Sequence, residues 1–293
     1  MPANAATTDA SCKICGSADL EVFAHTARCR ACGVLLYYPY PKSDDKLVSD
    51  GEGKGWPREE ALKWYSESSF LNHSNFTDML RFAVPTDQRG RKLDILDYGG
   101  GGGQFALVCR SHFPEATVHI TDISDEALLD EWRPLNRQIP FAEFGRDATR
   151  FDFIFLNDVF EHVSDPVGVL KQLAAKLKTG GRIFVDTPKQ FWIYPVAKVL
   201  SGSLYTKILR GTVTTFHLQI WSRSAFEKVA DQAGLNIAKY HETSEYTMPA
   251  AFYLKNMGIT NPILRAGGSL FYRNAKYLAK NKIMALLARG NDD

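Results

Sequence analysis

Four cysteines near the N-terminus are arranged as two pairs with the spacing of a metal site. Cys12 and Cys15 form the first Cys-x-x-Cys pair, and Cys29 and Cys32 form the second. Two such pairs can hold a zinc ion between four thiolates, and the ion then stabilises a segment too short to build its own core. We therefore expect a zinc-ribbon-like module over residues 1–45, with Zn²⁺ bound by Cys12, Cys15, Cys29 and Cys32. Two disulfides are the alternative, which a reducing cytoplasm disfavours.

A run of five glycines, Gly99 to Gly103, follows two positions after Asp97. Glycines adopt positive φ and carry no Cβ, so a bulky cofactor can approach the backbone closely. Dinucleotides and S-adenosylmethionine both bind such loops, and Gly101-x-Gly103-x-x-Ala106 fits the loose dinucleotide pattern. The carboxylate of Asp97 would repel a pyrophosphate, whereas it suits the sulfonium and amino groups of S-adenosylmethionine. Asp97 therefore favours S-adenosylmethionine as the cofactor.

Asp122 ends the next apolar run along the chain, TVHITD. An acidic side chain at the end of this second strand can accept hydrogen bonds from both ribose hydroxyls of a bound nucleoside. Both cofactor classes contain that ribose, so Asp122 supports a nucleoside cofactor without choosing between them.

Short apolar runs alternate with helical patterns from Leu93 onward. Strands are predicted at LDILDY, TVHITD, FDFIFLND, GRIFVDTP and KIMALLAR. Helices are predicted after the glycines, from Ser124, from Asp165 to Lys178, and after Ser222 with Gly234 as the stop. Strands that alternate with helices form parallel βαβ units, so the fold class is α/β with a doubly wound sheet. Its ligand is expected beyond the carboxyl ends of the strands, at the glycine turn.

The block FDFIFLNDVFEHVSDPVGVLKQLAAKLKTGGRIFVDTP resembles the class I S-adenosylmethionine-dependent methyltransferases. In that family a fourth strand ends in a polar Asn-Asp step, and a helix leads through LKTGG into the fifth strand. The later segment FHLQIWSRSAFEKVADQAGL is similar to the family's His-Leu-x-x-x-Ser helix entry. The resemblance covers Leu93 to Pro188 and this later segment. It implies a Rossmann-like seven-stranded sheet and cofactor contacts from Asp97, Gly99, Gly101, Gly103, Asp122, Asn157 and Asp158.

Methyl transfer to a hydroxyl group needs a residue that takes the hydroxyl proton, and histidine suits that task near neutral pH. His162 follows the fourth strand and His217 precedes the late helix, so both are expected at the rim where acceptors enter. Asp158 is a third candidate base. A structural role is the alternative for both histidines, because their sequence patterns recur in the family whatever the substrate.

The rest of the chain is expected to cover this site. Residues 46–90 are predicted as a helical linker or lid, and residues 91–293 as the methyltransferase domain, with an insertion over 189–221 that forms a cap. Asp and Glu are absent from 187–226 and from 246–291. These stretches predict a basic face for an anionic acceptor or for peripheral association with a lipid surface, and an ordinary solvated face is the alternative.

The leading functional expectation is O-methylation of a sugar, on a nucleotide-sugar or a lipid-linked glycan, as in surface-polysaccharide biosynthesis. It rests on the cysteine pairs, which are similar to the N-terminal zinc modules of bacterial sugar-tailoring methyltransferases. A quinone-like or secondary-metabolite phenol is the alternative acceptor. A nucleic-acid methyltransferase is disfavoured by the near-neutral charge of the N-terminal module and by the missing Asn-Pro-Pro-aromatic step. A non-catalytic scaffold is disfavoured because Asp97 and Asp122 are retained.

Composition places the chain among ordinary globular proteins. It has 293 residues, of which 45% are hydrophobic, and a formal net charge of +2. No apolar run approaches the roughly 18 to 20 residues of a membrane span, and the first ten residues contain no signal-peptide core. A cytoplasmic location is expected, with the inner face of the cytoplasmic membrane as the alternative. The fifth cysteine, Cys109, is expected to be a small buried residue.

Overall fold

The computed structural model describes most of the chain, namely residues 11–23, 25–40, 58–88, 90–190, 217–244, 250, 251, 254, 261–278 and 280–290. The greater part of the insertion predicted over 189–221 lies outside these residues. The same holds for the linker before residue 58 and for Lys198, Lys207, Arg210 and Lys255 of the expected basic face.

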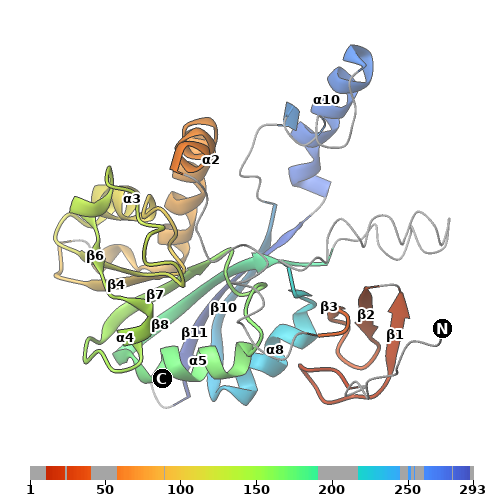
Figure 1. Cartoon of the computed structure of the whole chain (residues 1–293), viewed down its shortest axis with the longest axis horizontal. Coiled ribbons are helices and arrows are strands. Elements are labelled where there is room, and N and C mark those ends of the chain that lie inside the picture. The colour runs from red at the N-terminus through yellow and green to blue at the C-terminus, as the bar shows by residue number, and fades with distance from the viewer. Residues whose placement is uncertain are drawn as a thin grey trace.

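A seven-stranded sheet forms the centre of the molecule (Figure 1), with the strand order β10-β11-β8-β7-β4-β5-β6. Its strands are β4 Asp94–Tyr98, β5 Thr117–Thr121, β6 Arg137–Gln138, β7 Phe151–Asn157, β8 Leu177–Pro188, β10 Leu235–Thr243 and β11 Lys282–Arg289. The pairs from β6 to β8 are parallel, and β11 runs antiparallel to both of its neighbours. The predicted Rossmann-like α/β sheet is confirmed.

Helices cover both faces of the sheet. On one face lie α2 (Arg58–Ala83) and α3 (Phe105–His112), and on the other lie α5 (Pro166–Ala175) and α8 (Arg223–Gln232). Side chains alternate between these faces along each strand. Ile95 packs with α2 and α3, whereas its neighbour Leu96 packs with α5 and α8. Both faces are buried, which is why the strands read as continuous apolar runs.

Local signals in the sequence placed several helix ends correctly, but the helix predicted to reach Lys178 ends at Ala175, because Leu177 and Lys178 already belong to β8. The side chain of Asp165 caps α5 by accepting from Gly168 N at 2.9 Å, and Pro166 occupies the first turn. Ser222 caps α8 by accepting from Ala225 N at 3.1 Å, and Gly234 ends it with a φ of 74°. The helical pattern over 58–83 forms α2.

The helix predicted from Ser124 is wrong. That segment forms turns and a short 3-10 helix, η2 (Arg133–Leu135), before β6 and the short helix α4 (Phe141–Phe144). Leu129 donates its backbone N–H to Gly102 O at 3.2 Å, so the segment bonds to the glycine loop instead of to itself. Pro134 adds to the effect, because proline has no N–H for an interior helical bond.

The four-cysteine module forms a second, smaller sheet with the order β1-β2-β3-β9. Its strands β1 (Leu20–Phe23), β2 (Thr26–Cys29) and β3 (Leu35–Tyr37) come from the N-terminal segment, and β9 (Gln219–Ile220) comes from the segment just before α8. Val34 and Leu36 pack in the same hydrophobic core as α8. The module is therefore fastened to the large sheet by a strand and by a shared core.

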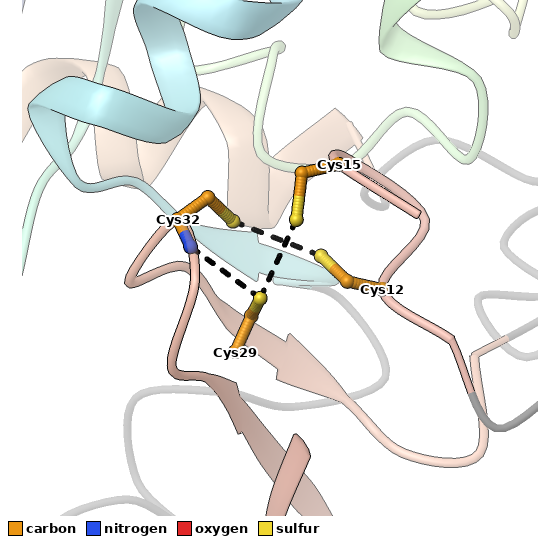
Figure 2. A group of neighbouring side chains, drawn as sticks. All are labelled: Cys12, Cys15, Cys29 and Cys32. Carbon is orange, nitrogen blue, oxygen red and sulfur yellow. Dashed lines mark hydrogen bonds between the residues drawn. The ribbon is translucent and has the colours of Figure 1, made fainter. Parts of the chain in front are cut away.

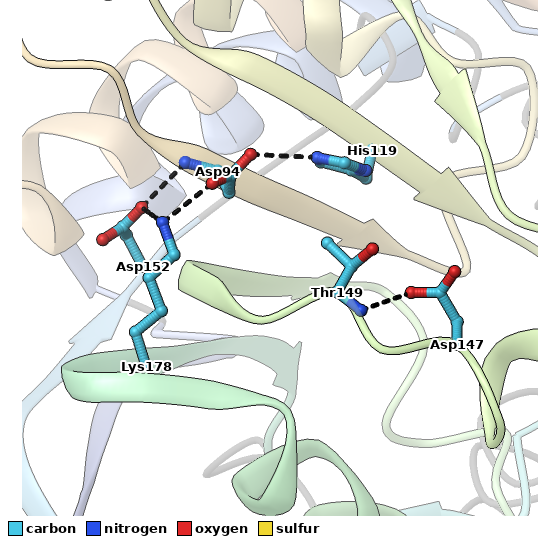
Figure 3. A network of polar contacts seen from close by, with 6 residues as sticks. All are labelled: Asp94, His119, Asp147, Thr149, Asp152 and Lys178. Atoms are coloured by element: carbon cyan, nitrogen blue, oxygen red, sulfur yellow. Dashed lines mark hydrogen bonds and ion pairs between the residues drawn. The ribbon is translucent and has the colours of Figure 1, made fainter.

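A polar network joins the amino ends of β4, β7 and β8 and includes His119 of β5 (Figure 3). Lys178 Nζ lies 2.8 Å from Asp94 Oδ2 and 2.7 Å from Asp152 Oδ2, and His119 Nε2 lies 3.2 Å from Asp94 Oδ1. Burial raises the pKa of Asp94, but Lys178 and His119 outweigh it and leave the pKa lowered. His119 is buried in β5 and belongs to this network, away from the glycine loop at the carboxyl ends of the strands.

The helix α10 (Pro262–Leu278) projects away from the sheet in Figure 1. It exposes Ile263, Leu264 and Leu270, each at least 63% accessible. Among the residues that the structure describes, no helix has both the length and the apolar character needed to cross a membrane.

Candidate functional site

The glycine loop lies between the carboxyl end of β4 and the start of α3, where an open parallel sheet binds its ligand. Gly99, Gly101 and Gly103 have φ values of 72°, 51° and 87°, a region that side chains rarely adopt. Packing also requires that Gly99 and Gly103 carry no side chain. A Cβ on Gly99 would lie 2.5 Å from Val159 Cγ2, and one on Gly103 would lie 2.5 Å from Leu128 Cδ1. The loop is therefore held closely between protein side chains on one side.

Asp97 contributes a buried carboxylate beneath this loop. It is 3% exposed, and within the described part of the chain nothing donates a hydrogen bond to its Oδ2. Burial, with a smaller contribution from the charge of Asp122, raises the pKa of Asp97 to about 7. An unpartnered buried acceptor is costly unless a ligand supplies a donor. The amino group expected of the cofactor would be such a donor.

Asp122 shapes the loop from the end of β5. Its Oδ2 accepts from Gly101 N at 2.9 Å, and its Oδ1 accepts from Ser124 N at 3.0 Å. Burial raises the pKa of Asp122, and these two N–H groups partly oppose the rise. A carboxylate has further lone pairs, so the same oxygens can also accept from ribose hydroxyls.

Helix α2 supplies a contact that the sequence did not single out. Gly102 N donates to the hydroxyl of Tyr65 at 3.1 Å, and the Tyr65 ring meets Trp132 edge-on at 5.0 Å between centroids. A Cβ on Gly102 would lie 2.7 Å from the Tyr65 ring. The only signal was the aromatic content of the helical pattern, which does not distinguish Tyr65 from its neighbours. The predicted lid segment thus reaches the cofactor loop.

A polar cluster occupies the carboxyl end of β7, beside the loop. Asn157 ends the strand, and its buried Oδ1 has no partner among the described residues. Asp158 follows with a φ of 52° and forms an ion pair with Lys282, whose Nζ also lies 2.6 Å from Asp186 Oδ2. Burial raises the pKa of Asp158, but the ammonium of Lys282 outweighs it and the pKa is lowered. This pairing makes Asp158 a weak base.

Glu161, His162 and His217 complete the cluster. One donor atom from each lies within 4.8 Å of the others, and the two imidazole centroids are 5.0 Å apart. His162 and His217, the two candidate bases chosen from the sequence, are 55 positions apart in the chain but are neighbours in the fold. Such a mixed carboxylate and imidazole set can accept and pass a proton near neutral pH.

Glu161 was not selected from the sequence, although it stands beside His162. It is 1% exposed, and its Oε2 accepts from the hydroxyl of Thr187 at 2.9 Å. Burial, followed by the negative charge of Asp158, raises the pKa of Glu161 to about 8. At neutral pH this side chain is mostly protonated, so it adds little negative charge to the cluster.

The four cysteines converge on one point in the N-terminal module (Figure 2). Cys12 Sγ lies 3.7 Å from Cys32 Sγ, and Cys15 Sγ lies 3.5 Å from Cys29 Sγ. Four sulfurs at about 2.3 Å from a tetrahedral zinc ion would be about 3.8 Å apart, so the spacing fits zinc and is too long for disulfides. The hydrogen bond from Cys32 lowers the pKa of Cys12 to about 5, and the same contact raises the pKa of Cys32.

Several other residues with titratable side chains lie away from this site. Cys109 is fully buried in α3, as expected. His25 stacks on Tyr37 within the module, and His73 is exposed on α2. Asp147 accepts from Thr149 N at 2.7 Å in the loop that enters β7, at the amino ends of the strands.

Comparison with known families gives one match over most of the chain. A family model described as a methyltransferase domain matches residues 23–240. The match begins inside the cysteine module, after Cys12 and Cys15, and runs through the glycine loop and the polar cluster to β10.

The individual proteins that resemble this chain have low sequence identity to it. A ubiquinone biosynthesis O-methyltransferase of Coxiella burnetii is 29% identical over 163 residues, which span 50% of this chain and 67% of that protein. A solved complex of the Haloferax volcanii Trm112 methyltransferase activator with a methyltransferase gives a TM-score of 0.54 at 14% identity, over 84% of this chain and 96% of that one. The cyclopropane synthase MmaA2 of Mycobacterium tuberculosis gives 0.53 at 14% identity, over 74% and 83%. The two solved structures support the fold alone.

Proposed function

This chain belongs to the methyltransferase-domain family and is an S-adenosylmethionine-dependent methyltransferase, and from that premise we propose that it methylates a hydroxyl oxygen of a small molecule. The observation that carries the proposal is the polar cluster of His162, His217 and Glu161 beside the cofactor loop. The side chain of Val159 packs against Gly99 and joins the cluster to that loop. A proton acceptor next to the methyl donor is what a hydroxyl substrate requires.

The residues of the loop fit the cofactor, which supplies an already activated methyl group. We assign Asp122 to the ribose hydroxyls and Asp97 to the amino group, because Asp97 keeps a buried oxygen that has no partner among the described residues. Gly99, Gly101 and Gly103 would give the loop the positive φ values that shape its backbone around the cofactor. Asn157, whose Oδ1 likewise has no partner within the described part of the chain, would orient the end of the cofactor that faces the acceptor.

Proton removal is assigned to the histidines. Asp158 is held by Lys282 and has a lowered pKa, so it is a poor acceptor at neutral pH. His162 and His217 are each partly exposed, and one of them would take the hydroxyl proton as the methyl group is transferred. A positioned general base contributes about 10² to 10⁴ in rate.

For the acceptor we propose a phenolic hydroxyl of a quinone-like compound. The support is the 29% identity to a protein named as a ubiquinone biosynthesis O-methyltransferase. The sugar hydroxyl that the sequence first favoured is the second candidate, and it rests only on the four-cysteine module. The relative compared above gives no support to a role in polysaccharide biosynthesis.

We also propose that the exposed end of α10 lies on an anionic lipid surface, where a lipophilic acceptor would be found. Ile263, Leu264 and Leu270 are exposed, Arg265 stands among them, and residues 246–291 contain no Asp or Glu. Leu264→Asp should reduce sedimentation with anionic vesicles severalfold, whereas Val22→Asp, at an exposed position on β1, should not. Equal sedimentation of all three proteins would contradict the proposal.

The acceptor proposal is tested by supplying S-adenosylmethionine with a short-chain ubiquinol that lacks one O-methyl group or with a nucleotide-sugar. Mass spectrometry should find a methyl ether in the first reaction. Methylation of the sugar alone would favour the second candidate. His162→Ala and His217→Ala are the matched variants, and His73→Ala on the exposed face of α2 is the control.

A further inference from the structure

We propose that the four-cysteine module is a structural part of the acceptor site and that Gln219 is the positioning residue that connects them. The inference rests on the proposed function of His162 and His217. It extends that function by assigning a role to a module which lies outside the methyltransferase sheet.

Strand β9 is the element shared by the two parts of the molecule. On one side it pairs with β3 of the module, in the register Leu36↔Gln219. On the other side, Leu218 N and Gln219 N both donate to Glu161 O, at 2.9 and 3.3 Å. His217 directly precedes this strand, so its backbone is fixed by bonds to the module and to the loop after β7.

The side chain of Gln219 adds a second set of bonds at the same point. Its amide is fully buried, and Nε2 donates to Phe160 O at 2.8 Å and to Val163 O at 2.9 Å. These carbonyls flank the pair Glu161 and His162. The other end of the amide, Oε1, accepts from the hydroxyl of Tyr40 at 2.6 Å. One side chain therefore holds the loop that carries His162 and is itself held by the N-terminal segment.

Further contacts attach the module to the same strand. Ser222 Oγ donates to the backbone oxygen of Cys32, at 2.5 Å, and Tyr37 N donates to Leu218 O at 2.8 Å. Trp221 is fully buried and stacks on Phe160 at 4.8 Å between centroids. The cysteine centre thus lies one hydrogen bond from the segment that sets the position of His217.

A buried amide that loses one partner is left with a costly unsatisfied group, and it shifts to recover a bond. Loss of the Tyr40 hydroxyl should therefore displace Gln219 and, with it, the loop that carries His162. The glycine loop makes no described hydrogen bond with the module, so cofactor binding should not change.

The test is Tyr40→Phe, which removes the hydroxyl and keeps the ring. Arg30→Ala, at a side chain 59% exposed on the module surface, is the matched control. The imidazole resonances of His162 and His217 are recorded by NMR with cofactor and without acceptor. We expect Tyr40→Phe to shift both sets of resonances, to lower kcat about tenfold, and to leave the affinity for S-adenosylmethionine unchanged.

Gln219→Leu is the second variant, with a similar volume and no polar atoms, and it should give larger shifts in the same resonances. Unchanged histidine resonances in Tyr40→Phe would overturn the inference, whatever the acceptor is. Shifted resonances in a protein that methylates no hydroxyl would uphold the coupling and count against the proposed function instead. The two failures are therefore distinguishable.

Discussion

Asp158, which directly follows β7, has its charge state set by a residue far away in the sequence. It is the single non-glycine residue with positive φ among those described, and Lys282, from β11, pairs with it. Strained backbone of this kind persists only where the surroundings hold it, and it gathers at functional sites. The pairing lowers the pKa of Asp158, which supports our proposal that one of the two histidines is the base.

Asp122 should contribute strongly to cofactor affinity. Asp122→Ala removes the acceptor that we assign to two ribose hydroxyls, and hydrogen bonds to charged groups are worth about 1.5 to 3 kcal/mol each. We expect S-adenosylmethionine to bind at least tenfold more weakly by calorimetry. Asp122→Asn keeps one acceptor oxygen for Gly101 N, and it should bind with intermediate affinity. Equal affinities in all three proteins would refute the assignment.

Glu161 should make the protein less stable as the pH rises. Its folded pKa of about 8 exceeds the ordinary value of 4.5, so the folded state holds the proton longer than the unfolded state. The contribution is complete below about pH 4.5 and is lost as the pH rises through 8.

Glu161→Gln stays neutral and should flatten the decline in unfolding free energy between pH 5 and pH 8, by up to about 1.4 kcal/mol per pH unit. Asp97 and Asp186, whose pKa values burial raises to about 7, leave a residual slope. Urea unfolding at several pH values measures the slope of the unfolding free energy against pH, and Glu227→Gln, at an exposed position, is the control. A slope identical to that of the native protein would show that Glu161 ionises normally.

Single residues were predictable from the sequence where the strand pattern placed them. Asp97, Asp122 and Asn157 each follow an apolar run, and each lies at the expected edge of the sheet. Their partners were not predictable, because Tyr65 and Lys282 reach the site from segments whose packing no local pattern reveals. His162 and His217 were selected as candidates, but only the fold shows that they are neighbours.

At the scale of elements, the glycine loop makes the sharpest prediction. Gly99→Ala and Gly180→Ala both place a side chain at φ near +72°, which costs about 1 to 2 kcal/mol. Only the first also meets a neighbour, because a Cβ would lie 2.5 Å from Val159 at Gly99 and would have open space at Gly180.

We expect Gly99→Ala to lose about 1 to 3 kcal/mol more than Gly180→Ala in chemical unfolding. It should also bind S-adenosylmethionine more weakly, whereas Gly180→Ala should not. Equal losses of stability would mean that the loop adapts and that its bareness serves the cofactor alone.

Helices and strands were predicted correctly from the sequence where their local capping residues and their tertiary contacts favour the same structure. Helix α5 has an aspartate cap and a first-turn proline, and α8 has a serine cap and a glycine stop. The segment after Ser124 has helix-forming residues, but its backbone bonds to the glycine loop, a tertiary contact that overrides propensity. Strand β9 was equally hidden, because its two residues pair only with the distant β3.

At the scale of the whole molecule, the cysteine module and the methyltransferase sheet share one hydrophobic core. We propose that one zinc ion holds the module together. Metal analysis should find one equivalent per chain, lost on Cys32→Ser. Because Cys32 packs in the core that includes Trp221 and Phe226, this variant should also lower the melting temperature, whereas Cys109→Ser should not release metal. Intact protein without zinc, or with disulfides under reducing conditions, would contradict the proposal.

The central claim is that this methyltransferase transfers its methyl group to oxygen with the help of the histidine pair. The most direct measurement supplies S-adenosylmethionine with an isotopically labelled methyl group and the demethylated ubiquinol, and follows the label on the acceptor oxygen. The account predicts a labelled methyl ether, formed at least about 100-fold more slowly by the variant in which both His162 and His217 are alanine, with cofactor affinity unchanged. Label on carbon or nitrogen of the acceptor, or the same rate in the variant, would contradict it.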